Sequence, residues 1–147
     1  MGVLTEYFVA RDDQDATRAH AALTGPRELG FKTAEWKSID PVVALAVLEE
    51  IVNGTKVLEW IKSHAGDDQI VAGAGEDEHW VFRVTPEHTK TLADLPDAVR
   101  PIAERWAKSE ELDRADPAVL TDVLVSLRDL ARDARNTGQR LYCWVSL

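Results

Sequence analysis

Apolar residues recur at three- and four-residue spacing near the end of the chain and predict a long amphipathic helix. The expected buried stripe of this helix consists of Leu120, Val123, Leu124, Leu127, Leu130, Ala131 and Ala134. Asp116 followed by Pro117 is typical of a helix start, and Gly138 stands where a helix-ending glycine is expected. Residues 141–147 are then almost wholly apolar. We therefore expect them to form a strand that is paired within a sheet and buried.

Three more segments have the pattern of strands. Residues 3–10 and residues 80–84 alternate between the two faces of an extended chain and carry aromatic side chains, which predicts a strand in each. Residues 31–39 fit either a short strand or an extended loop. Within the loop-like stretch that precedes residue 76, residues 69–71 are expected to pair only briefly.

Helix signals fill much of the remaining chain. Asp40-Pro41 is typical of a cap followed by a proline in the first turn, and residues 42–52 are apolar apart from Glu49 and Glu50. A helix that is apolar nearly all round is buried. Further helices are expected from Asp12 or Asp13 to Leu23, from Thr85-Pro86 through Leu95, and over Asp97–Lys108. Another helix is expected to follow Thr55, with Val57, Leu58, Trp60 and Ile61 turned inward.

The order of these elements is strand, helix, uncertain strand, helices, strand, helices, strand. A doubly wound parallel sheet would require a regular alternation of strands and helices, which this order lacks. We predict a single α+β domain over residues 1–147. In that domain, several helices pack on a small mixed or antiparallel sheet that includes the N-terminal and C-terminal strands.

Acidic residues outnumber basic ones and give the chain a formal net charge of −9. Residues 41–96 hold much of this excess, with ten acids against four bases. Such a surface repels phosphate backbones, so we expect no binding to nucleic acid. No segment approaches the roughly 20 apolar residues of a membrane span, and no secretory leader is evident, so we expect a cytoplasmic protein without membrane contact. The sequence carries no signal for its oligomeric state.

Several motifs that would indicate an enzyme fail on inspection. Ala72-Gly73-Ala74-Gly75 begins like a dinucleotide-binding loop, but Glu78 stands at the position of the third glycine. The single cysteine, Cys143, lies in the terminal apolar strand, where a cysteine is a small interior residue rather than an activated nucleophile. No Gly-x-Ser-x-Gly elbow is present. We therefore predict no catalytic residue and no cofactor.

An acidic loop supports an alternative hypothesis. Glu76, Asp77 and His79 have side chains of the types that bind metal ions. The contiguous acids of this loop diverge from one another, however, and their spacing matches no calcium-binding loop. The alternative is a small metal-assisted hydrolase that uses these three residues.

Five tryptophans are many for 147 residues, and one of them lies outside every predicted core stripe. This residue, Trp36, is flanked by charged residues that include Lys37. Tryptophan is enriched among the residues that dominate binding energy at protein interfaces. The competing interpretation is a tryptophan that covers the rim of the core. We predict Trp36 and Lys37 as partner-binding residues.

The chain opens with Met1-Gly2-Val3-Leu4-Thr5-Glu6-Tyr7-Phe8, and it ends with a helix over residues 127–136, a turn at Gly138 and the apolar strand of residues 141–147. In these features, and in the segment that starts at Val84-Thr85-Pro86, it resembles the bacterial YfbM-like proteins. The resemblance implies an α+β domain with both termini in the core. That family has no established activity, so the resemblance implies no catalytic residue.

The leading functional hypothesis combines the failed catalytic motifs with the acidic middle segment and Trp36. It describes a non-catalytic module that binds another protein through an acidic and aromatic surface. The metal-assisted hydrolase is the alternative.

Overall fold

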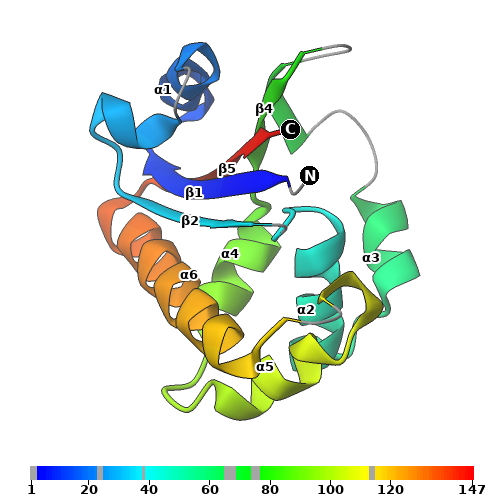
Figure 1. The fold of residues 1–147 in the computed structure, drawn as a ribbon. Coiled ribbons are helices and arrows are strands. Elements are labelled where there is room, and N and C mark those ends of the chain that lie inside the picture. Colours follow the sequence, from blue (N-terminus) through cyan, green and yellow to red (C-terminus); the bar gives the residue numbers. More distant parts are fainter. Residues whose placement is uncertain (1–2, 23–24, 38, 65–68, 74–76, 113–114) are drawn as a thin grey trace.

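The structure is a computed structural model that describes residues 3–22, 25–37, 39–64, 69–73, 77–112 and 115–147. Its centre is a five-stranded antiparallel sheet in the order β2-β1-β5-β4-β3 (Figure 1). The strands are β1 (Leu4–Ala10), β2 (Thr33–Lys37), β3 (Ile70–Ala72), β4 (His79–Arg83) and β5 (Arg140–Ser146). The predicted α+β class is confirmed, and the sheet is antiparallel rather than mixed.

The helices vary widely in length. They are α1 (Asp13–Thr17), α2 (Val43–Asn53), α3 (Val57–Ser63), α4 (Pro86–Ala93), α5 (Arg100–Ala107) and α6 (Pro117–Thr137), with short 3-10 turns over Arg18–Ala21, Pro26–Leu29 and Glu110–Leu112. None of these described helices has the length and apolar character that a membrane crossing requires.

The first and last strands form the centre of the sheet. β5 lies between β1 and β4, and Cys143 is paired with Tyr7 on one side and with Phe82 on the other. Tyr142 and Cys143 are fully buried. The predicted terminal strand is therefore confirmed as a buried, paired element over residues 141–145, whereas Leu147 lies beyond the strand and is 70% exposed. Leu4 of β1 pairs with Ser146 of β5.

Each face of the sheet has its own core. Tyr7 and Cys143 point to the face where α2, α4, α5 and α6 build the large core. Phe8 and Tyr142 point to the opposite face, where they pack with Ala16 of α1 in a smaller core. In Figure 1, α1 lies above the sheet and the larger helices lie below it. The domain thus has a thick helical layer on one side and a thin one on the other.

Burial of the α6 stripe anchors the helical layer to the sheet. Each of the predicted stripe residues, from Leu120 to Ala134, is buried. A fully buried leucine stabilises a fold by about 2 kcal/mol relative to an exposed one. This helix is also capped as predicted, because Asp116 Oδ1 accepts the Ala118 N–H at 2.8 Å and Gly138 takes a positive φ of 67°.

Several predicted helices differ from the structure: α5 begins at Arg100 rather than at Asp97, and α4 ends at Ala93 rather than at Leu95. The first helix is shorter than expected, since α1 ends at Thr17 and a 3-10 turn continues only to Ala21; the predicted end at Leu23 lies outside the described residues. In α3, the expectation that Leu58 turns inward is wrong, because its side chain is 71% exposed. Trp60 sets the inward face of this helix, and a residue two positions earlier lies about 200° around the helix axis.

Arginines of α6 fasten the end of α4 to the long helix. The Arg132 guanidinium donates to the Ala93 carbonyl oxygen at 2.9 Å, and Arg128 donates to the Pro96 carbonyl oxygen at 2.8 Å. Arg135 Nη1 lies 2.8 Å from Asp94 Oδ1. The Arg132 contact satisfies a carbonyl group that the end of α4 leaves without an intrahelical partner, and the other two hold the segment that follows the helix.

Candidate functional site

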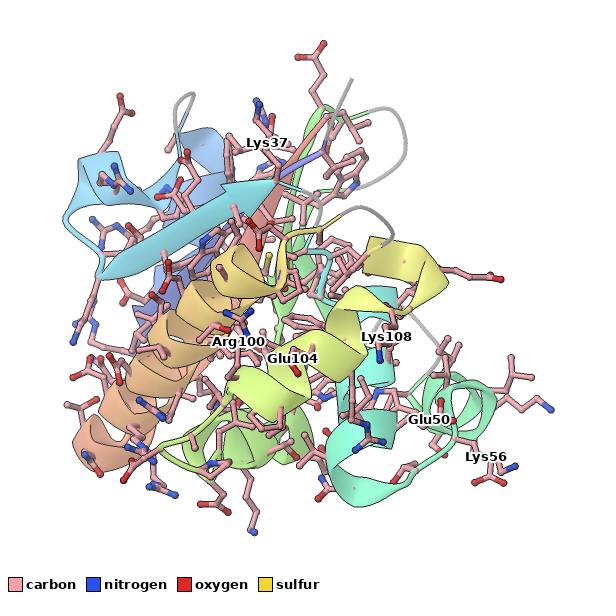
Figure 2. All side chains as sticks on the ribbon, turned by 60° about the horizontal axis from the view of Figure 1, so that its bottom comes forward. Lys37, Glu50, Lys56, Arg100, Glu104 and Lys108 are labelled. Carbon is pink, nitrogen blue, oxygen red and sulfur yellow. The ribbon has the colours of Figure 1, made fainter. Side chains whose placement is uncertain are left out.

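The predicted partner-binding residues lie on β2, the strand at one end of the sheet. Trp36 is partly buried against the large core, on the face that the helices cover. Lys37 is exposed at the C-terminal end of the strand, as Figure 2 shows. Thr5 Oγ1 donates to the Trp36 carbonyl oxygen at 2.8 Å, which fixes the backbone beside the indole.

A groove of about 350 Å³ opens between β2 and the first turns of α6. Trp36 forms part of its apolar lining, and Val119, which is 52% exposed, stands on the α6 side. Glu111 and Asp116 bring two acids to the groove, and Lys37 brings one base. The groove therefore combines apolar surface with a net negative charge.

In the described part of the chain, the outer edge of β2 presents backbone groups that bond to no strand. The Val9 N–H donates to the Lys32 carbonyl oxygen at 3.3 Å, which identifies the hydrogen-bonded pairs of the β1–β2 ladder. Bonding directions alternate along an antiparallel strand, so the N–H and C=O groups of Thr33, Glu35 and Lys37 point away from β1. Within the described ranges, no other strand pairs with this side of β2. Such an edge is a template for a further extended segment.

The residues of the metal hypothesis are occupied by other contacts or lie outside the described part. His79 Nδ1 lies 3.2 Å from Ser146 Oγ, and the His79 ring stacks on Trp144 with centroids 5.2 Å apart. Asp77 Oδ2 lies 3.5 Å from His20 Nε2. Glu76 is outside the described residues. Among the residues that are described, no three potential ligands gather around one point, and the metal site stays a prediction.

A buried Glu–His pair between α2 and α4 was missed by the sequence reasoning. His88 Nδ1 lies 3.0 Å from Glu49 Oε2, and neither side chain is more than 5% exposed. Thr91 Oγ1 donates to Glu49 Oε1 at 2.9 Å, and Asn53 Nδ2 donates to the same oxygen. Burial raises the pKa of Glu49, but the hydrogen bonds from His88, Asn53 and Thr91 outweigh it and bring the pKa below its ordinary value.

The imidazoles of His88 and of a second histidine, His64, pack against Trp60. The ring centroids of His88 and His64 lie 4.1 Å and 4.0 Å from that of Trp60. His88 Nε2 is buried, and it has no hydrogen-bond partner among the described residues. A carboxylate that orients an imidazole occurs in both catalytic and metal sites. Here no set of three described ligands includes the pair, and its contacts join α2, α3 and α4 in the core.

Cys143 has no nucleophilic character. The residue is fully buried, and burial raises the pKa of its thiol well above the ordinary value. A thiol must ionise to act as a nucleophile, so this cysteine is inert at neutral pH. The prediction that Cys143 is an interior residue is confirmed.

Comparison with known proteins assigns the chain to no group. No family model matches it, and neither a curated protein nor a solved structure does so. The similarity of the chain ends to YfbM-like proteins stays a prediction from the sequence. The function is therefore inferred from the geometry of the sites themselves.

Proposed function

We propose that the protein is a non-catalytic binding module that takes an extended segment of a partner protein along the outer edge of β2. The segment adds a strand to the sheet, and one of its apolar side chains enters the groove beside Trp36. The observation that carries this proposal is the coincidence of an unpaired strand edge with an apolar groove at the same element.

The backbone of β2 supports strand addition. Thr33, Glu35 and Lys37 direct their N–H and C=O groups to the open side of the strand, at the spacing that a second strand requires. Peptide recognition by strand addition takes its affinity from such main-chain hydrogen bonds, and side-chain pockets add specificity.

The groove supports a particular partner chemistry. Its apolar lining at Trp36 and Val119 suits an aliphatic or aromatic side chain of the partner. Glu111 and Asp116 suit a lysine or arginine close to that side chain. The expected partner is therefore an extended segment in which an apolar residue lies near a basic one. The basic residue of such a partner would also be attracted by the net negative charge of the protein.

A single proline tests the strand edge. Glu35→Pro removes an N–H that points outward and leaves every hydrogen bond between β1 and β2 in place. We expect peptides of about ten residues, selected for binding from a random library, to lose at least about tenfold in affinity for this variant, which corresponds to 1.4 kcal/mol. Glu35→Gln is the matched control, because it removes the same charge and keeps the N–H. Isothermal titration measures both affinities.

Trp36→Ala tests the groove in the same assay. We expect it to weaken the selected peptides about tenfold, as the loss of an aromatic anchor does, with a modest fall in the melting temperature because Trp36 is only partly buried. The bound peptide should also slow amide hydrogen exchange at Glu35 and Lys37. Peptides that bind Glu35→Pro as tightly as the unmodified protein would contradict the proposal.

A further inference from the structure

We propose that Glu6 carries a proton and donates it to Glu35, and that this bond between a carboxyl group and a carboxylate makes the attachment of β2 to the sheet sensitive to pH. Glu6 belongs to β1 and is only 1% exposed, whereas Glu35 is exposed on the outermost strand β2. A buried carboxylate is strongly destabilising unless it is paired, and without a partner it takes up a proton instead. The proton acts in the free protein, so no partner in the groove beside β2 is required.

The register of the sheet brings the two acids together. Glu6 and Glu35 are directly opposite each other in the β1–β2 ladder. The hydrogen bond between Val9 and Lys32 sets the alternation of the ladder and makes Glu6 and Glu35 a non-hydrogen-bonded pair, in which side chains approach most closely. Their carboxyl groups are in hydrogen-bonding contact. Two carboxylates have no donor between them, so this contact is attractive only when one of the groups is protonated.

The surroundings of Glu6 offer its carboxyl group few donors. The Arg27 N–H donates to Glu6 Oε1 at 3.1 Å. Oε2 is buried, and no described residue donates to it. Gly25, with a φ of 105°, lies so close that a side chain at this position would collide with Oε2. On the other side of Glu6, the residue opposite it on β5 is Trp144, which carries no charge. Protonation therefore gives this closed site a donor that it lacks.

The charges near Glu6 act in the same sense. Burial is the main cause that raises the pKa of Glu6 above its ordinary value of 4.5, and the negative charge of Glu35 raises it further. Arg27 lowers the pKa through its N–H and its positive charge, but the pKa stays above 4.5. Lys37 follows two residues beyond Glu35 on the same face of β2, where its side chain is exposed to solvent.

The direction of the pH effect follows from this pKa. A group whose pKa is higher in the folded than in the unfolded state stabilises the fold below its unfolded pKa. This contribution is lost as the pH rises through the folded pKa. For Glu6 the loss begins at about pH 4.5, and it continues as the pH rises further.

Loss of the proton weakens the single ladder that holds β2. Within the described residues, β2 pairs with β1 alone, so repulsion between Glu6 and Glu35 acts at its only strand partner. β1, β5 and β4 are paired independently of β2, and we expect β2 to loosen before them. Because Trp36 of β2 lines the groove described above, the same proton affects the shape of that groove.

Glu6→Gln tests the effect on stability. The amide accepts from the Arg27 N–H and donates to Glu35, so it imitates the protonated acid at every pH. We expect the unmodified protein to lose stability relative to this variant as the pH rises from 4 to 8, and the variant to unfold at the higher urea concentration at pH 8. The matched control is Glu28→Gln, which removes an exposed acid from the turn Pro26–Leu29. Its stability relative to the unmodified protein should not change over this interval.

Two NMR measurements locate the effect. The side-chain carboxyl carbon of Glu6 should titrate with a midpoint above 4.5, and Glu35→Gln should lower this midpoint because it removes the neighbouring negative charge. The N–H groups of Ala34 and Trp36 point towards β1. At pH 8 they should exchange with solvent faster in the unmodified protein than in Glu6→Gln, whereas the amides of β4 should show no such difference.

Three results would overturn the proposal. These are a Glu6 midpoint at or below 4.5, a midpoint that Glu35→Gln leaves unchanged, and a constant stability difference between Glu6→Gln and the unmodified protein from pH 4 to pH 8. The carboxyl titration uses the unmodified chain, so it decides the question even if Glu6→Gln does not fold. No measurement here uses a peptide, and a failure is therefore distinct from a failure of the proposed peptide site.

Discussion

Single residues of this protein take their roles from distant contacts as well as from their neighbours. Glu49 is acidic in a helix that is mostly apolar, and it is acceptable in the core because His88, Asn53 and Thr91 donate to its carboxylate. A buried carboxylate without such partners would be strongly destabilising. The α2–α4 contact therefore depends on four polar side chains acting together.

Glu49→Gln tests this dependence. The variant replaces a buried carboxylate by a neutral amide and weakens its charge-assisted hydrogen bonds, so we expect the free energy of unfolding to fall by about 1.5–3 kcal/mol. Glu50→Gln is the matched control, because Glu50 is exposed and is the next residue in the same helix (Figure 2). Its effect should stay within about 0.5 kcal/mol. Urea denaturation measures both, and equal effects would show that the buried pair does not stabilise the fold.

Asp15 gives the protein a defined acid sensitivity. Hydrogen bonds from Arg11 are the main cause that lowers the pKa of Asp15 from 3.8 to about 2, with Arg18 contributing as well. A carboxyl whose pKa is lower in the folded state stabilises the fold above its unfolded pKa. That contribution is lost as the pH falls from about 4 to about 2. We expect the stability difference between the unmodified protein and Asp15→Asn, from urea denaturation, to shrink over this interval. A constant difference would contradict this assignment.

Local signals made several residues predictable. Thr85 and Asp116 cap helices in the structure, and Gly138 ends one, because each role depends on residues within four positions. The Glu49–His88 pair is different, since 39 residues separate its members. The only signal in the sequence was an acid in a helix predicted to be buried, which requires a partner but does not identify it.

At the scale of elements, the terminal strand has the largest structural role. β5 pairs with both β1 and β4, so its removal separates the sheet into two parts. We expect deletion of Tyr142–Leu147 to abolish cooperative thermal unfolding, followed by circular dichroism. Deletion of Leu147 alone is the control, because this residue is exposed, and the melting temperature should change little. A truncated chain with a normal melt would show that the other strands form the core alone.

The buried face was predicted well for a long helix with a regular spacing of apolar residues, and less well for a short helix. The α6 stripe has seven buried positions in agreement with its pattern, which identifies both the helix and its buried face. The seven-residue helix α3 has too few positions for its period to define a face. There the contact of Trp60 with His88 decides the orientation and leaves Leu58 in solvent.

At the scale of the whole molecule, composition and element order indicate the class but not the arrangement. The α+β class followed from strands interrupted by helices without regular alternation. Strand order depends on pairing between residues that are far apart, such as Leu4 with Ser146, and no periodicity within a segment encodes it. The groove beside β2 was hidden for the same reason. Trp36 was predicted from its neighbours, whereas its groove is completed by α6.

The central pairing of β1 with β5 has a consequence for synthesis in the cell. A ribosome completes β1 long before it reaches β5, because almost the whole chain lies between them. Until then β1 can pair only with β2, and an isolated two-stranded ribbon is marginal in water. The apolar side chains of β1 therefore stay exposed to solvent while translation continues. Exposed apolar segments of this kind favour aggregation. The sheet can therefore close only after β5 has left the ribosome exit tunnel, because β5 joins β1 to β4.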